Sequence, residues 1–323
     1  MLPVAAGNQW RRIRSSIVSS SLVNKILELK RKRNAVILAH NYQVAEIQDI
    51  ADFVGDSLGL SVQAAATQAD VIVFCGVYFM AETAAILSPN KTVLLPDKHA
   101  GCPMADMITA EQLSKLKAEH PQALVVCYVN STAEVKALCD YCCTSSNAAK
   151  LVENLPEDKD IIFVPDQHLG AFVQARSGRK LILWPGFCPT HVRMTAEQVN
   201  DARIAHPGAV VLAHPECGPA VRAVADQLLS TSQMIAFAGK SPANRFIIAT
   251  EEGILHSLRK KYPHKEFYPV SDKAVCPNMK KITLEKLLWS LEDMQTVISV
   301  SPAIAQHARR ALDRMLEVLP DKS

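Results

Sequence analysis

The sequence predicts an α/β protein built from three related units, each containing a small parallel sheet. Two observations carry this prediction. A cysteine stands directly before a proline at Cys102, Cys188 and Cys276, with intervals of 86 and 88 residues. In addition, apolar runs of strand length alternate with helical stretches, which is typical of parallel strands joined by crossover helices. The chain is therefore expected to be triplicated, with the cysteines at equivalent positions.

The interval between the cysteines recurs in the segments around them. A Thr-x-Glu motif follows each Cys-Pro pair, beginning at Thr109, Thr195 and Thr283, again 86 and 88 residues apart. Several unrelated features that keep one period indicate internal duplication. Units this small bury their own faces poorly, so we expect them to pack on one another.

Each unit is expected to run strand, helix, strand, helix, strand, cysteine loop, helix. The expected first strands are 35–40, 123–128 and 209–214, the second 70–76, 160–166 and 245–250, and the third 91–97, 180–186 and 266–272. Helices are expected between them, as at residues 79–87 and 253–261. Capping boxes at Thr109 and Thr195 start a helix seven residues after a cysteine, so the cysteines belong to strand-to-helix loops. A last helix should begin near Ser301, with Pro302 in its first turn.

Length and composition limit the class of protein. At 323 residues and 49% hydrophobic content, the chain can bury a substantial core. A net charge of +3 is too small to indicate a nucleic-acid surface, although it suits small anionic substrates. No apolar run approaches the roughly 18 residues of a membrane span. We expect a flexible extension at 1–21, domains at 22–104, 105–190 and 191–300, and a helix at 301–319 that packs back on the first domain.

Polar side chains follow the first strand of each unit. The strand ends read His40-Asn41-Tyr42, Tyr128-Val129-Asn130 and His214-Pro215-Glu216, and hydroxyls recur further on at Ser57, Ser145 and Thr231. Ligands collect at the carboxyl ends of parallel strands, and hydroxyls beside helix N-termini suit carboxylate or phosphate. Taken singly, such a hydroxyl is most often a helix cap, and such a histidine is as often a core residue. Their recurrence in three units favours a shared anion site.

The nine cysteines, with no export signal, predict a reducing compartment, and we expect the cytoplasm. We interpret six of them as buried thiols, although two have CxxC spacing: Cys75, Cys127, Cys139, Cys142, Cys143 and Cys217. The other three, Cys102, Cys188 and Cys276, could converge on one centre. Zinc would take them with water or His191 as the fourth ligand. A 4Fe-4S cluster, which the pattern slightly favours, would keep one iron without a protein ligand.

The chain resembles the quinolinate synthase family, the A protein of de novo NAD biosynthesis. The resemblance runs in order from about residue 22 to the C-terminal helix. It is carried by the segments 39–43, 55–58, 100–102, 128–131, 143–148, 165–167, 184–191, 214–217, 230–232, 250–253 and 276–279. Pro103, after the first cysteine, departs from the family pattern, and the third cysteine lacks the extra cysteines of some members.

The resemblance implies a triangle of three αβα domains around a central active site. It implies one 4Fe-4S cluster held by Cys102, Cys188 and Cys276, with an open iron that acts as a Lewis acid. The resemblance also implies a transferase. In the implied reaction, iminoaspartate (iminosuccinate) condenses with dihydroxyacetone phosphate to give quinolinate, phosphate and two waters. Functional coupling to an L-aspartate oxidase is expected, and neither nucleic acid nor membrane is an expected partner.

Roles follow for the strand-end residues. Glu216 and His214 are expected to act as general base and acid, Tyr42 and Tyr128 as phenol donors, and His40 as a ligand of substrate or intermediate. The expected substrate-binding residues are His40, Ser57, Tyr128, Asn130, Ser145, His191, His214, Glu216, Thr231 and Lys240. Two rivals stay open: an aconitase-like hydro-lyase, which would join no second molecule, and a redox or regulatory iron–sulfur protein.

Overall fold

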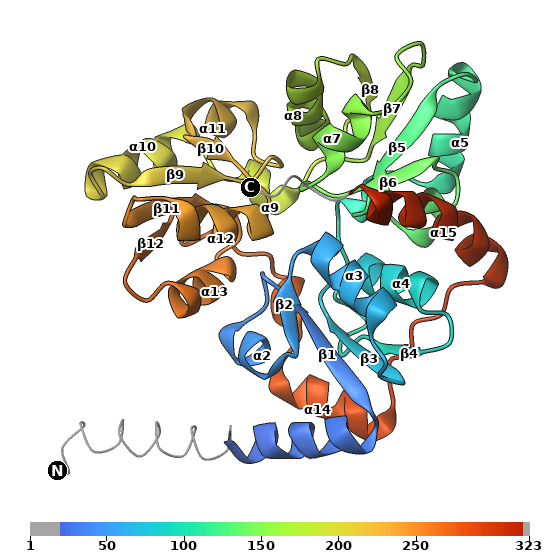
Figure 1. Cartoon of the computed structure of the whole chain (residues 1–323), viewed down its shortest axis with the longest axis vertical. Helices are drawn as coiled ribbons and strands as arrows, with labels where there is room; N and C mark the ends of the chain where they lie inside the picture. The colour runs from blue at the N-terminus through green and yellow to red at the C-terminus, as the bar shows by residue number, and fades with distance from the viewer. Residues whose placement is uncertain (1–19, 319–323) are drawn as a thin grey trace.

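The structure is a computed structural model that describes residues 20–318. It contains three four-stranded sheets, all parallel, with the strand orders β2-β1-β3-β4, β6-β5-β7-β8 and β10-β9-β11-β12. The three sheets and their helices form three lobes of a triangle (Figure 1). The predicted fold class is confirmed.

The bounds of the elements follow the triplication. The first unit contains β1 (Ala35–His40), α2 (Ala45–Ile50), β2 (Phe53–Gly55), α3 (Ser57–Ala66), β3 (Val71–Cys75), α4 (Tyr78–Leu87) and β4 (Thr92–Leu94). The second contains α5 (Ala110–Glu119), β5 (Leu124–Tyr128), α6 (Ala133–Lys136), β6 (Tyr141–Cys143), α7 (Ala148–Glu153), β7 (Ile161–Val164), α8 (Gln167–Ser177) and β8 (Leu181–Leu183). The third contains α10 (Ala196–Ala205), β9 (Val210–Ala213), α11 (Pro219–Val224), β10 (Gln227–Leu228), α12 (Thr231–Lys240), β11 (Arg245–Ala249), α13 (Ile254–Lys261) and β12 (Glu266–Pro269).

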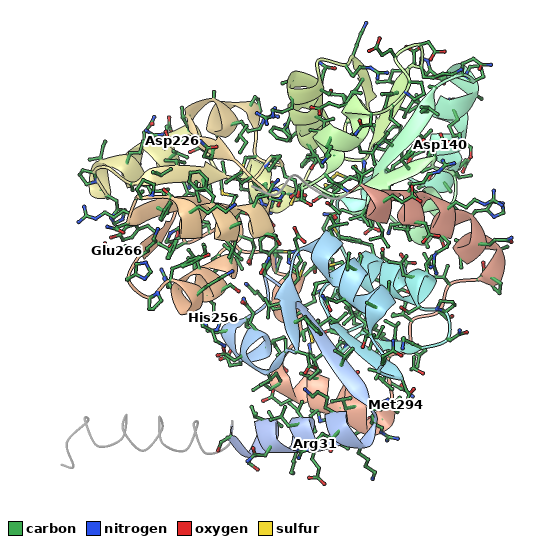
Figure 2. The ribbon with its side chains drawn as sticks, viewed as in Figure 1. Arg31, Asp140, Asp226, His256, Glu266 and Met294 are labelled. Carbon is green, nitrogen blue, oxygen red and sulfur yellow. The ribbon has the colours of Figure 1, made fainter. Side chains whose placement is uncertain are left out.

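The first strand of each unit occupies an inner position and is braced by an aspartate that sequence reasoning missed. The carboxylates of Asp52, Asp140 and Asp226 accept from backbone N–H groups of β1, β5 and β9 at 2.8, 2.8 and 2.7 Å. The three positions keep the same 88- and 86-residue intervals as the rest of the repeat. Asp140 and Asp226 lie in the outer parts of their units, away from the centre of the triangle (Figure 2). Their role is therefore structural.

The short edge strands are the main difference from the predicted elements. Strands β2, β6 and β10 are only two or three residues long, and none of them was predicted. β2 is largely exposed and carries no alternating pattern, so only its pairing with β1 defines it. The observed third strands are also shorter than predicted, because the chain leaves each sheet early to form the cysteine loop.

The helices after the cysteine loops begin where the sequence predicts. Thr109 caps α5 and Thr195 caps α10, each through a complete capping box with the glutamine three residues later. A third box, from Ser230 to Gln233, starts α12. Each box satisfies backbone N–H groups that the first helical turn cannot pair internally.

The remaining helices join the units. α14 (Leu284–Asp293) falls in the range expected for the third domain, yet it packs against β3 of the first unit. α15 (Pro302–Glu317) begins at the predicted cap, Ser301, and contacts α4 together with α6 and β6. It therefore lies between the first and second units rather than on the first alone, and Figure 1 shows it there in red.

Most of the expected N-terminal extension, residues 1–19, lies outside the described residues. Residues 20 and 21, which are also expected in the extension, belong to a helix at 20–32. Ile26 of this helix is fully buried in the core. Within residues 20–318, no helix combines the length and apolarity that a membrane crossing requires.

The apolar core is divided unequally. One continuous cluster spans the first two units and takes in α14 and α15. The third unit has its own clusters on the two faces of its sheet. The first two sheets thus share one core, whereas the third sheet is held by clusters of its own.

Candidate active site

A cavity of about 170 Å³ lies where the carboxyl ends of the three sheets meet. It is lined by residues of all three units. Its lining includes most of the predicted site residues: His40, Tyr42, Ser57, Cys102, Tyr128, Asn130, Ser145, Cys188, His191, His214, Glu216, Thr231 and Cys276. Lys240 is the exception. It is exposed and is the last residue of α12, whereas Thr231 is the first. The geometry therefore gives Lys240 no place in the site.

The two strand-end histidines are held in the same way. The Nδ1 atom of His40 accepts from the backbone N–H of Tyr42 at 3.2 Å, and Nδ1 of His214 accepts from that of Glu216 at 3.3 Å. An accepting Nδ1 leaves the proton of a neutral imidazole on Nε2. Burial lowers the pKa of each histidine to about 3, so both are neutral at physiological pH.

Glu216 is a buried carboxylate with two strong partners. Its Oε1 accepts from the Tyr128 hydroxyl at 2.6 Å, and its Oε2 lies 2.7 Å from Nδ1 of His191. Burial alone would raise the pKa of Glu216, but His191, His214 and the hydrogen bonds from His191 and Tyr128 outweigh it, and the pKa is lowered. The carboxylate is therefore ionised inside the cavity and able to accept a proton.

Three hydrogen bonds and one short contact between His191 and Glu216 form a chain that links the first unit to the second through this carboxylate. The Tyr42 hydroxyl lies 2.6 Å from the hydroxyl of Thr250, which lies 2.8 Å from Nε2 of His191. His191 and Tyr128 then meet on Glu216. Burial, together with the Glu216 charge, raises the pKa of both tyrosines well above 10, so both phenols keep their protons. The chain can carry protons between ends contributed by different units.

Three hydroxyls line the cavity from the three units. Ser57 and Thr231 are the first residues of α3 and α12, whose caps are the preceding residues Asp56 and Ser230. The hydroxyls of Ser57 and Thr231 are therefore not the helix caps, because the preceding residues cap both helices. Thr231 Oγ1 accepts from the Asn41 amide at 2.9 Å, and Ser145 Oγ lies 3.2 Å from Nε2 of His214. Two helix N-termini aimed at a cavity favour an anionic ligand there.

The three Cys-Pro loops have one architecture. Each cysteine precedes a single helical turn: η1 (Ala105–Met107), α9 (Pro189–Val192) or η2 (Met279–Lys281). The backbone of each turn acts to lower the pKa of its cysteine: Met104 and Ala105 act on Cys102, His191 on Cys188, and Asn278 and Met279 on Cys276. Backbone groups that favour the thiolate also suit a thiolate ligand of an iron–sulfur cluster. The donor set fits a three-thiolate cluster.

Burial raises the pKa of all three thiols, that of Cys102 to about 12. Without a cation these sulfurs are therefore thiols, and a bound metal must displace their protons. The other six cysteines are buried and free, which agrees with their interpretation as packed thiols. Of the two cysteines with CxxC spacing, Cys142 is on β6 and is paired in register with Cys127.

A buried ion pair that sequence reasoning missed ties the third cysteine loop to the first unit. Glu251 is fully buried; its carboxylate accepts from the backbone N–H of Cys276 at 3.0 Å and lies 2.8 Å from Lys280 Nζ. Lys280 also donates to the backbone carbonyl of Tyr42 at 2.7 Å. A Glu-x-Gly sequence after a strand was the only available signal, and nothing local points to its lysine partner.

Comparison with known proteins gives one consistent result. A family model described as quinolinate synthetase A protein matches residues 24–317. A quinolinate synthase of Dehalococcoides mccartyi is 58% identical over 295 residues, which cover 91% of this chain and 97% of the relative. One from Geobacter metallireducens is 54% identical over 303 residues, 94% of this chain and 99% of the relative. Quinolinate synthase 2 of Methanosarcina acetivorans is 54% identical over 297 residues, 92% and 96% of the two chains.

Proposed function

Because this chain belongs to the quinolinate synthetase A protein family, we propose that it condenses iminoaspartate (iminosuccinate) with dihydroxyacetone phosphate to form quinolinate for NAD biosynthesis. The products are quinolinate, phosphate and two waters. The observation that carries the proposal is the chain of polar contacts from Tyr42 to Tyr128, because it places one ionised carboxylate between two protonated phenols in a buried cavity. A reaction that removes carbon-bound protons and expels water needs both kinds of group.

The charges of the substrates suit the walls of the cavity. Iminoaspartate carries two carboxylates and dihydroxyacetone phosphate carries a phosphate, and the hydroxyls of Ser57, Ser145 and Thr231 face the space between them. Asn130 offers an amide whose Oδ1 is buried without a hydrogen-bond partner among residues 20–318. An unpaired buried amide oxygen is costly, so a donor group of the substrate is its natural partner.

Glu216 is the proposed general base. It is ionised, and Tyr128 and His191 fix both of its oxygens, so that a proton gained at the carboxylate can be shared along the chain. Tyr42 and Tyr128 are the proposed proton donors to departing oxygens, and His214 the proposed acid through its Nε2–H. His40, neutral and with Nδ1 engaged, would orient substrate through Nε2.

Cys102, Cys188 and Cys276 would hold one 4Fe-4S cluster. When bound, it would supply Lewis acidity through the iron that has no protein ligand. The backbone of the three turns, which favours the thiolate form of each cysteine, supports this assignment. The proposal includes a cytoplasmic location, which suits nine free cysteines, and a supply of iminoaspartate from an L-aspartate oxidase.

The reaction is tested with anaerobically reconstituted protein supplied with iminoaspartate and dihydroxyacetone phosphate. Quinolinate and phosphate should appear in equal amounts. An aconitase-like hydro-lyase would release no phosphate from dihydroxyacetone phosphate, and a redox or regulatory protein would turn over neither compound. The ligand assignment is tested by counting iron and sulfide in Ala variants of Cys102, Cys188 and Cys276, each of which should lose the cluster.

The role of Glu216 is tested with Glu216→Gln, which keeps the shape of the side chain but removes the base. Quinolinate formation should fall about 10²- to 10⁴-fold, while iron and sulfide contents stay at the wild-type level. Glu197→Gln, at an exposed position on α10, is the matched control and should leave the rate unchanged. Near-normal turnover in cluster-replete Glu216→Gln would remove Glu216 from the catalytic assignment.

A further inference from the structure

We propose that the cluster-free protein has a second metal site, in which Cys188, His191 and Glu216 bind one Zn²⁺ ion. One ligand atom from each of these residues lies within 4.8 Å of the other two. His191 Nδ1 is 3.1 Å from Cys188 Sγ and 2.7 Å from Glu216 Oε2. Ligand atoms around a tetrahedral zinc lie about 3 to 4 Å apart, given metal–ligand bonds of about 2.0 to 2.3 Å. Small side-chain shifts would therefore allow all three ligand atoms to bind one ion.

The donor chemistry favours zinc over harder cations. A thiolate, an imidazole and a carboxylate are the three kinds of zinc ligand in proteins, whereas Mg²⁺ and Ca²⁺ prefer oxygen ligands alone. Three protein ligands leave a fourth position open toward the cavity, as in catalytic zinc sites. His191 and Glu216 are both buried, with exposed fractions of 1% and 3%, so the ion would be sheltered from competing solvent.

The hydrogen bonds behind the ligands fit the same assignment. Nε2 of His191 lies 2.8 Å from the Thr250 hydroxyl, which fixes the ring with Nδ1 toward Cys188 and Glu216. Tyr128 donates to Glu216 Oε1 and leaves Oε2 for the ion. Outer partners of this kind orient metal ligands and raise metal affinity about 10- to 100-fold. The structure therefore contains both the three direct ligands and the side chains that hold two of them in place.

Zinc and the cluster must exclude one another, because Cys188 belongs to both ligand sets. This step rests on the proposed function, whereas zinc binding itself does not. A zinc ion would bind the proposed base Glu216 as well as a cysteine of the cluster. The zinc form would therefore be inactive for two reasons: it would lack the cluster, and its base would be blocked. The site would make the protein sensitive to the ratio of zinc to iron while the cluster is being assembled.

The experiment uses the full-length, cluster-free protein under anaerobic conditions. Zn²⁺ is titrated and bound metal is counted after dialysis, and Co²⁺ serves as a spectroscopic substitute that reports thiolate ligation. Wild type should bind one ion per chain. Cys188→Ser and His191→Gln should weaken binding at least ~100-fold, because each removes a direct ligand, and Thr250→Val about 10- to 100-fold. Cys102→Ser and Cys276→Ser are the matched controls and should keep the wild-type affinity.

The competition is measured by loading the protein with one equivalent of Zn²⁺ before iron and sulfide are added. Zinc should block cluster formation in wild type but not in His191→Gln, which keeps all three cysteines. Loss of zinc binding in Cys102→Ser or Cys276→Ser would overturn the proposal, since zinc would then occupy the three-cysteine set. So would the absence of stoichiometric binding to wild type. Failure of the proposed function would show separately, as a cluster-replete protein that makes no quinolinate.

Discussion

At the scale of single residues, the three units carry different functional groups at equivalent positions. His40, Tyr128 and His214 end the first strand of each unit or follow it directly, and the residues two positions later are Tyr42, Asn130 and Glu216. The backbone contact to Nδ1 is the same for both histidines, which shows that the local geometry is repeated. Since the geometry is shared, the chemical differences come from the side chains alone.

The buried histidines make stability depend on pH. The pKa of His40 is about 3 in the folded protein and about 6.5 in the unfolded chain, so protons bind more tightly after unfolding. The stabilising contribution is complete above pH 6.5 and is lost as the pH falls from there toward 3. Between pH 7 and pH 5 this single group should lower the free energy of unfolding by about 2 kcal/mol.

The check compares cluster-free wild type with His40→Asn by urea unfolding at pH 7 and pH 5. An asparagine can accept the same backbone hydrogen bond but does not titrate. The difference between the two free energies of unfolding should therefore change by about 2 kcal/mol over this range. His99→Asn, at an exposed position, is the control. Equal pH dependence in wild type and His40→Asn would contradict the neutral, buried state of His40.

At the scale of elements, short pieces determine where the site residues lie. One helical turn follows each cysteine, and each of the three hydroxyls that line the cavity follows an edge strand of two or three residues. α15 has the opposite character: it is long and amphipathic, and it buries Ala308, Ala311, Leu312 and Met315 against elements of two units. It acts as a clamp between the first and second units.

Leu312→Ala should therefore destabilise the protein by about 2 to 5 kcal/mol, because it removes a fully buried side chain and leaves a cavity between α15 and its neighbours. Arg310→Ala, at an exposed position of the same helix, should change the free energy of unfolding by no more than about 0.5 kcal/mol. Both values come from urea titrations of the cluster-free protein. Equal stability of the two variants would show that α15 does not clamp the units.

At the scale of the whole molecule, the cavity exists only where the units meet. The chain of polar contacts passes from Tyr42 in the first unit to Tyr128 in the second, through residues of the third unit and of its junction with the second. The contact between the first and third units is especially close at Gly253. A Cβ added there would lie 2.7 Å from the carbonyl carbon of Tyr42 and 2.8 Å from its Cα.

Gly253→Ala should force the first and third units apart and displace Tyr42 from Thr250. Overpacking of this kind costs about 1 to 3 kcal/mol, and quinolinate formation should fall with it. The backbone of Gly253 has φ −57°, which alanine adopts freely, so the effect would come from the contact alone. Gly218→Ala is the matched control, since φ is also −57° and nothing lies within 4 Å of the new methyl group. A stable, active Gly253→Ala would contradict the tight interface.

The order of residues along the chain is enough to predict the triplication, the alternation of strand and helix, the capped helices and the three cysteine loops. These features depend on local rules that every repeat obeys: turn chemistry, hydrophobic periodicity and spacing along the chain. Only the packed structure establishes which side chains meet. It paired Glu216 with Tyr128 and His191, paired Glu251 with Lys280, moved α14 onto the first unit and left Lys240 at the far end of α12. Such contacts join residues tens to hundreds of positions apart. Their geometry is set by how the shared core of the first two units and the clusters of the third pack together, and no single segment carries a signal for that packing.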